Sequence, residues 1–112
     1  MKAVQAGASA QAESQLARDL RVIEFLKADL AAGVAAVYRA MARVNDEAVS
    51  EALASVVVGA YVLARRLGIS PARLDMKVES RVRSAMAEPH ELEQWYGDFS
   101  ALYRHFQGGG RR

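Results

Sequence analysis

Residues 46–67, DEAVSEALASVVVGAYVLARRL, decide the fold of this chain. One apolar stripe recurs at helical spacing and comprises Val49, Leu53, Val56, Ala60, Leu63 and Leu67. A second set, Ala52, Val57, Tyr61 and Ala64, widens the stripe until little of the middle is polar. A helix that is apolar all round is normally buried all round. The segment therefore predicts a central helix over about 47–67, with Asp46 as its N-cap.

The sequence before this segment predicts another, longer helix. Apolar residues recur at spacings of three, four and seven from Leu16 to Val44, and only Lys27 interrupts the series. The Asn45-Asp46 pair then breaks the pattern. Residues 1–12 are rich in Ala, Gly, Ser and Gln, and we expect them to form a flexible leader.

Two further helices are predicted after the central one. Gly68 stands where a helix-ending glycine is expected, and Ser70-Pro71 provides the N-cap and first-turn proline of a helix over 71–86. A fourth helix over about 90–106 carries five of the eight aromatic residues, and Gly97 within it predicts a closely approaching neighbour. The fold class is therefore all-α, a four-helix bundle in one domain over 13–107, followed by a flexible tail over 108–112.

The composition suits a cytoplasmic protein. The absence of Cys excludes disulfides and thiolate metal sites. The longest apolar stretch, 52–64, would span roughly 20 Å as a helix, which is less than a bilayer requires, so we expect no membrane partner. The N-terminus up to Gln11 has no apolar block long enough for a signal peptide. A formal net charge of +2 does not favour strong nonspecific binding of nucleic acid.

Self-association is expected from the apolar surface of the central helix. A chain of 112 residues has a modest core, and each helix of a four-helix domain buries only one stripe. Leaving so much apolar surface exposed on a monomer would be unusual. We therefore expect oligomerisation to complete the bundle, in a homodimer or a tetramer, with Val56, Val57 and Tyr61 at the interface.

Three segments carry a resemblance to a known family. They are IEFLK at 23–27, YVLARRLGI at 61–69 and HELEQWYGDFSAL at 90–102. Together they are similar to the MazG-like branch of the all-α nucleoside triphosphate pyrophosphohydrolases, from about Val22 to Phe106. The resemblance implies a helical bundle that assembles into dimers or tetramers. For the active enzymes of the family it also implies release of pyrophosphate from nucleoside triphosphates. These enzymes hold Mg²⁺ with a Glu-x-x-Glu pair on one helix and a Glu-x-x-Asp pair on the next.

The chain departs from that acidic pattern. No Asp or Glu occurs over 30–45 or over 52–74. By the resemblance, Ala52 and Ser55 stand where the Glu-x-x-Asp pair belongs, and Gly33 and Ala36 where the first pair belongs. We therefore expect a catalytically impaired, nucleotide-binding or assembly module, for which no catalytic residue and no cofactor is assigned. The alternative is an active Mg²⁺-dependent enzyme with atypical ligands, namely Glu24, Asp29, Glu47 and Glu51.

Other constellations point to weaker alternatives. Residues 63–74 also resemble a DNA-binding helix-turn-helix, but Asp75 and Glu79 on the would-be recognition helix repel phosphates, so DNA binding is not expected. Lys77 and Arg81 are candidate phosphate ligands within a basic set that also holds Arg65, Arg66, Arg73 and Arg83. His90 and Glu93 lie one turn apart and could share a metal ion, although an acidic first turn more often complements the helix dipole.

Overall fold

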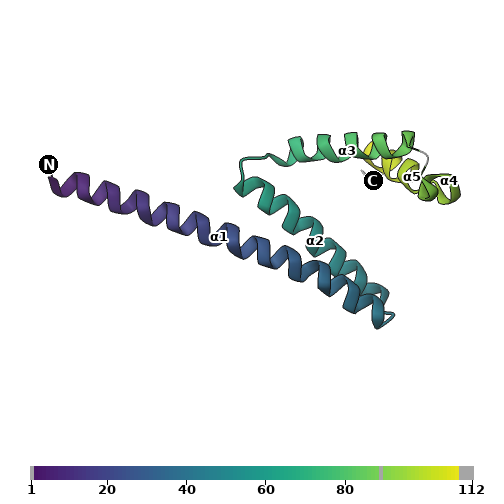
Figure 1. The fold of residues 1–112 in the computed structure, drawn as a ribbon, viewed down its shortest axis with the longest axis horizontal. Coiled ribbons are helices and arrows are strands. Elements are labelled where there is room, and N and C mark those ends of the chain that lie inside the picture. The colour runs from purple at the N-terminus through teal and green to yellow at the C-terminus, as the bar shows by residue number, and fades with distance from the viewer. Residues whose placement is uncertain (1, 89, 109–112) are drawn as a thin grey trace. The chain divides into compact units, whose positions relative to one another are not determined.

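The computed structural model describes residues 2–88 and 90–108. These residues form five α-helices and no strand (Figure 1), which confirms the all-α class. The helices are α1 (Lys2–Ala42), α2 (Asp46–Arg66), α3 (Pro71–Ala87), α4 (Glu91–Tyr96) and α5 (Asp98–Phe106). They form two compact units, residues 1–69 with α1 and α2, and residues 70–112 with the remaining helices. The single domain expected over 13–107 stays a prediction.

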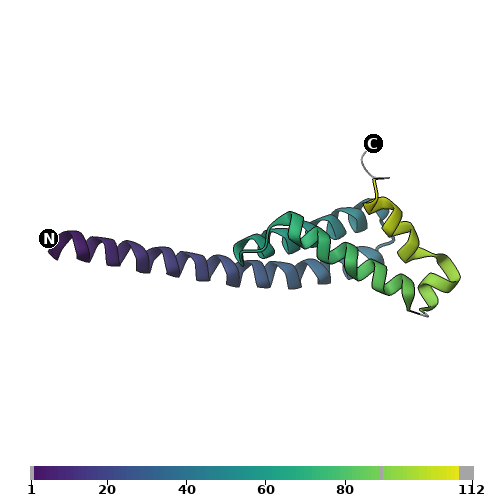
Figure 2. The same cartoon turned by 90° about the horizontal axis from the view of Figure 1, so that it is seen from above.

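The first unit is a helical hairpin. Helix α2 runs back along the C-terminal half of α1, and both views show the two helices side by side (Figures 1 and 2). Small residues allow the close approach, because Gly33 of α1 faces Val56, and Gly59 of α2 is buried beneath Leu30. Each of these glycines thus makes room for a larger side chain of the other helix.

Helix α1 starts earlier than expected. The sequence predicts a flexible leader over 1–12, whereas α1 is helical from Lys2 onward. Alanine is the strongest helix former, and the Ala-rich composition of this segment favours continuation of the helix. The tail residues 109–112 lie outside the described residues, so the flexible tail stays a prediction.

A tight turn over Arg43–Asn45 joins the two helices. The Val44 backbone adopts φ 52°, in the left-handed region that β-branched residues rarely enter. The Asn45 side chain accepts a hydrogen bond from the Ala48 N–H at 3.1 Å, so Asn45 is the N-cap and Asp46 the first helical residue. The prediction of Asp46 as N-cap is wrong by one position, since either side chain can cap and the backbone selects Asn45.

The cap signals between α2 and α3 are confirmed. Gly68 adopts φ 86°, and the Ile69 N–H donates to the Ala64 carbonyl at 2.8 Å, as in a Schellman motif. The Ser70 hydroxyl accepts from the Arg73 N–H at 3.2 Å, with Pro71 in the first turn. Local sequence chemistry therefore fixes where α2 ends and where α3 begins.

In the second unit, α5 packs against both α3 and α4. The predicted fourth helix is in fact two, because Gly97 adopts φ 65° and separates α4 from α5. The expected four helices are therefore five. A Cβ on Gly97 would meet nothing within 4 Å, so the expected close neighbour is also wrong. Glu93 holds the joint by accepting hydrogen bonds from the Ser100 N–H, at 3.0 Å, and from the Ser100 hydroxyl.

Few residues of the described chain are buried. The buried apolar residues are Leu26, Ala40, Ala64 and Val82. Of the described helices, α2 alone is long and apolar enough, by length and composition, to cross a membrane. Only Gly59 and Ala64 of α2 are buried, so the expectation of a helix buried all round is not met in the single chain. Many large apolar residues on α1 and α2 are exposed in the single chain.

Candidate functional site

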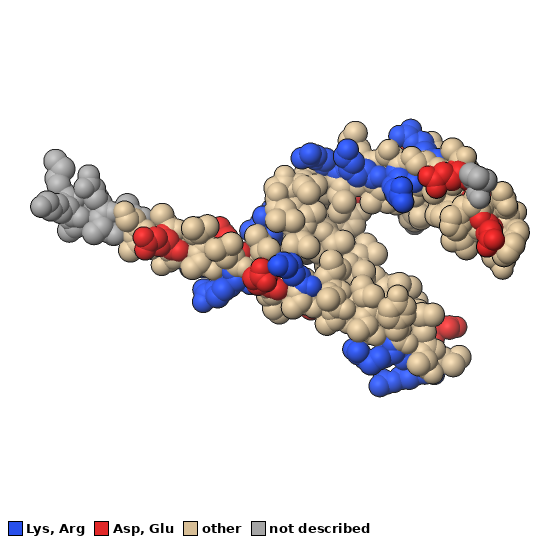
Figure 3. Space-filling model, viewed as in Figure 1, with Lys and Arg blue, Asp and Glu red and all other residues tan. Residues whose placement is uncertain are grey.

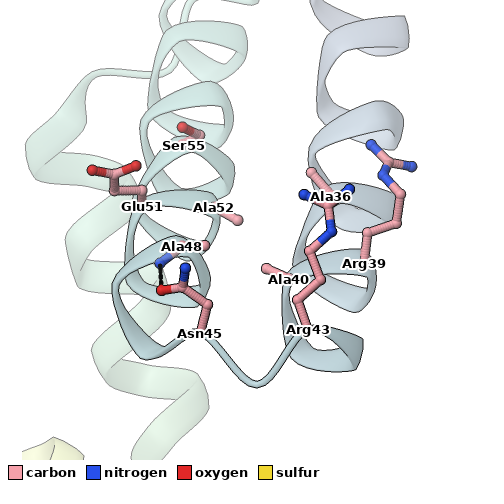
Figure 4. A pocket seen from close by; sticks show the side chains of 9 residues that line it. All are labelled: Ala36, Arg39, Ala40, Arg43, Asn45, Ala48, Glu51, Ala52 and Ser55. Atoms are coloured by element: carbon pink, nitrogen blue, oxygen red, sulfur yellow. Dashed lines mark hydrogen bonds between the residues drawn. The ribbon is translucent and has the colours of Figure 1, made fainter.

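A cavity of about 350 Å³ lies where α1 ends and α2 begins. It is lined by Ala36, Arg39, Ala40, Arg43, Asn45, Ala48, Glu51, Ala52 and Ser55 (Figure 4). We call it the hairpin cavity. Four of its lining residues are alanines and the other five are polar. The polar residues come from the end of α1, from the turn and from the first three turns of α2.

The hairpin cavity coincides with the positions at which the family resemblance expects carboxylates. Ala36, Ala52 and Ser55 line it, although they come from two helices. The fourth position, Gly33, instead faces Val56 inside the hairpin. By the resemblance, these three methyl or hydroxyl side chains occupy positions at which carboxylates that hold Mg²⁺ are expected. Neither a methyl group nor a single neutral hydroxyl supplies the carboxylate oxygens that Mg²⁺ prefers.

Arginines supply most of the charge of this cavity. Arg39 and Arg43 are one helical turn apart on α1, and the Arg43 side chain runs along the helix toward Ala36 (Figure 4). The Glu51 carboxylate points away from α1 (Figure 4). Within residues 2–88 and 90–108, neither guanidinium group forms an ion pair. Basic side chains gather at this end of the hairpin in the space-filling view (Figure 3).

The four atypical metal ligands proposed from the sequence have different surroundings in the structure. Glu24 pairs with Lys27 at 3.0 Å on the exposed surface of α1. Asp29 lines a second cavity of about 330 Å³ together with Val58 and Val62. Glu47 is exposed in the first turn of α2, and Glu51 lines the hairpin cavity. Among the described residues, no group of three or more Asp, Glu or His side chains is arranged to hold a metal ion.

The remaining polar candidates belong to the second unit. Lys77 and Arg81 are exposed four residues apart on α3, at the spacing of one helix face. His90 is the N-cap of α4, and its Nδ1 accepts from the Leu92 N–H at 3.0 Å. Glu93 is engaged by Ser100, and these hydrogen bonds hold the pKa of its carboxyl below the usual range. His90 and Glu93 thus stabilise the ends of α4.

The apolar candidates for an interface differ in their surroundings. Val56 packs against Gly33 within the hairpin, and Tyr61 is half-buried, whereas Val57 is 54% exposed. Val57 belongs to an exposed group, the apolar face, formed by Val34, Met41, Leu53 and Val57. Each member is two residues from a residue of the hairpin cavity, a rotation of about 200° at 3.6 residues per turn. The apolar face therefore lies on the opposite side of the hairpin from the cavity.

Sequence reasoning did not identify Arg39 and Arg43. Their spacing of four within the acid-free stretch 30–45 is a usable signal, because unneutralised cations then project from one helix face. What the sequence lacks is the register of α1 on α2, which makes Arg39 and Arg43 line the same cavity as Ala52 and Ser55. The Arg39 side chain lies on the side of α1 away from α2 (Figure 4).

Comparison with known proteins supports the resemblance read from the sequence. No curated protein and no solved structure matches the chain. The model of the MazG-like family matches residues 16–99, well over half of the 112 residues. The match spans α1 from Leu16, the hairpin cavity and the Gly97 joint. On this match, and with its all-helical fold, the chain belongs to the MazG-like family.

Proposed function

We propose that this MazG-like protein is related to the nucleotide pyrophosphohydrolases but does not hydrolyse nucleoside triphosphates, and acts as a nucleotide-binding or assembly module. One observation carries the proposal. The cavity expected to hold catalytic Mg²⁺ is lined by Ala36, Ala52 and Ser55 in place of carboxylates. A metal that bridges phosphates requires oxygen ligands of high charge, and this cavity offers only Glu51, which points away from α1 (Figure 4).

Loss of the carboxylates removes the chemical step but need not remove binding. Mg²⁺ in such enzymes orients the phosphates and stabilises the charge that develops at the leaving group. Without it, water attack on a phosphoanhydride has no activated nucleophile. The shape of the cavity and its arginines remain, and these suit a phosphate-bearing ligand.

The assembly function rests on the apolar face. Its four residues are 39% (Val34), 56% (Met41), 49% (Leu53) and 54% (Val57) exposed in the single chain. Removing apolar area of this kind from water contributes about 25 cal/mol per Å², which favours association of two copies. A two-fold homodimer places the same face of each copy against the other and leaves the hairpin cavity open, and a tetramer repeats the arrangement. We place this assembly in the cytoplasm.

The proposal is tested by a pyrophosphate-release assay. Purified protein with Mg²⁺ or Mn²⁺ should leave a panel of canonical and damaged nucleoside triphosphates intact. Turnover that disappears in both Glu47→Gln and Glu51→Gln would contradict the proposal and establish the active, Mg²⁺-dependent alternative. An Asp98→Asn variant, which changes charge on α5 in the other unit, serves as the matched control.

A helix-turn-helix regulator is the second candidate. The Gly68 turn and the capped start of α3 favour it, while Asp75 and Glu79 on α3 oppose it. Binding to random duplex DNA should be weak and lost at moderate salt. A sequence-specific footprint that disappears in Arg73→Ala would favour this candidate over the first.

A further inference from the structure

We infer that the hairpin cavity binds the polyphosphate group of a nucleotide directly through Arg39 and Arg43, without a divalent cation. The inference rests on the proposed function and deepens it, because it names the ligand chemistry of the same cavity. In the metal-dependent arrangement, carboxylates hold a cation and the cation holds the phosphates. Here Glu51 is the one carboxylate of the lining and points away from α1 (Figure 4), and the arginines of the protein itself provide the positive charge.

The lining of the cavity is suited to an anion. Two guanidinium groups, the Ser55 hydroxyl and the Asn45 side chain are its hydrogen-bonding groups apart from Glu51. The Asn45 side-chain oxygen is already used by the Ala48 N–H, which holds the turn in place. The alanines on both helices leave room that longer side chains would fill, and about 350 Å³ accommodates a di- or triphosphate group.

The two arginines have no competing anion. No ion pair occupies either guanidinium in the described part of the chain, and the Glu51 carboxylate points away from α1 (Figure 4). A guanidinium is planar, always charged, and presents paired N–H donors that match two oxygens of a phosphate. Two such groups one helical turn apart can engage adjacent phosphates of one chain.

An alternative explanation of the arginines is purely structural. Cations near the end of a helix complement the negative end of its dipole, and Arg39 lies in the last turn of α1. Lysine serves that purpose equally well, because only charge is required. A phosphate site distinguishes the two residues, since lysine keeps the charge but loses the bidentate fork.

The test is calorimetric titration of the full chain with inorganic triphosphate in EDTA, free of divalent cations. We expect saturable binding, weakened about tenfold by either Arg39→Gln or Arg43→Gln and about a hundredfold by both, since a charged hydrogen bond contributes enough for a factor of ten. The matched control, Arg18→Gln with Arg21→Gln, removes equal charge from α1 upstream of the cavity and should change affinity less than twofold. Titration with adenosine triphosphate then shows whether a nucleotide binds more tightly than the bare polyphosphate.

The outcomes separate this inference from the proposed function. Binding that requires Mg²⁺, or that falls equally in the two double variants, would overturn direct recognition by Arg39 and Arg43. Absence of binding with and without Mg²⁺ would also overturn it. That result would not contradict assembly through the apolar face or the lack of hydrolysis. Retention of full affinity in Arg39→Lys with Arg43→Lys would overturn recognition by the guanidinium groups, because charge alone would then suffice. Turnover of a nucleoside triphosphate instead contradicts the proposed function and is measured in a separate assay.

Discussion

A Cβ placed on Gly33 would lie 3.3 Å from Cγ2 of Val56 across the hairpin. This separation is tighter than an ordinary contact between side chains. Valine is stiff about its first torsion, so it yields little to a new neighbour. Gly33 and Val56 therefore set how closely α1 and α2 approach beside the hairpin cavity.

Enlarging Gly33 should weaken the hairpin. Gly33→Leu is expected to lower the free energy of unfolding by about 1–3 kcal/mol, the usual cost of overpacking. Gly59→Ala is the control, because its added Cβ would lie at 3.6 Å from Leu30 Cδ1 and should stabilise the helix by up to about 1 kcal/mol. Urea unfolding at one fixed protein concentration measures both. Equal stability of Gly33→Leu and the parent chain would mean that the helices do not meet at this position.

The turn before α2 should respond to relief of backbone strain. Val44 occupies φ 52° and is 88% exposed, so its side chain contributes little packing. Val44→Asn should raise the free energy of unfolding by about 1 kcal/mol, because asparagine tolerates the left-handed region better than valine. Gly68→Ala at φ 86° is the reverse substitution and should be destabilising. Thermal unfolding would refute this account if Val44→Asn proved less stable than the parent.

The apolar face should mediate self-association. Light scattering at micromolar concentration is expected to give at least twice the chain mass of 12.2 kDa. Val57→Glu should shift the mass toward monomer and lower stability, because it brings a charge into the contact. Val58→Glu is the matched control. Val58 is the next residue of α2, points about 100° away from Val57 around the helix axis, and lines the second cavity. A native chain that stays monomeric at high concentration would exclude this face as an interface.

The Gly97 joint should lose stability in acid. Hydrogen bonds from the Ser100 side chain, and then from its backbone, lower the pKa of Glu93 from its ordinary 4.5. A lowered folded-state pKa means that the ionised carboxylate stabilises the fold. Its contribution is complete above pH 4.5 and is lost as the pH falls through the lower, folded-state pKa. Ser100→Ala should therefore flatten the acid limb of a circular-dichroism titration below pH 4.5, with Ser80→Ala on α3 as control. An unchanged acid limb in Ser100→Ala would contradict the assignment.

Local signals in the sequence account for most helix boundaries. Gly68 and the Ser70-Pro71 pair act within a few residues of themselves, so their effect can be predicted without knowing the fold. The break at Gly97 could not be predicted in this way. It depends on the left-handed conformation of Gly97 and on hydrogen bonds from Ser100 to Glu93, seven residues earlier in the chain. The sequence shows where Gly97 lies but does not predict its left-handed conformation.

The candidate site, too, could be predicted only in part from the sequence. The expectation that Ala36, Ala52 and Ser55 replace acidic residues comes from the resemblance of the sequence to the family pattern. That these three positions meet in one cavity requires the pairing of α1 with α2. The same pairing decides that Arg39 and Arg43 share the cavity, which is why residue spacing alone did not reveal them.

The two-sided hairpin has a consequence for how the chain can change length during evolution. Residues of the cavity and of the apolar face alternate along α2, so Ser55 and Val57 point to opposite sides. Inserting one residue near Ala54 would rotate everything beyond it by about 100° and would move valines out of the apolar face. Homologous chains should therefore tolerate many substitutions in α2 but almost no insertions or deletions. Length variation should concentrate in the N-terminal half of α1, which extends beyond α2 (Figure 1).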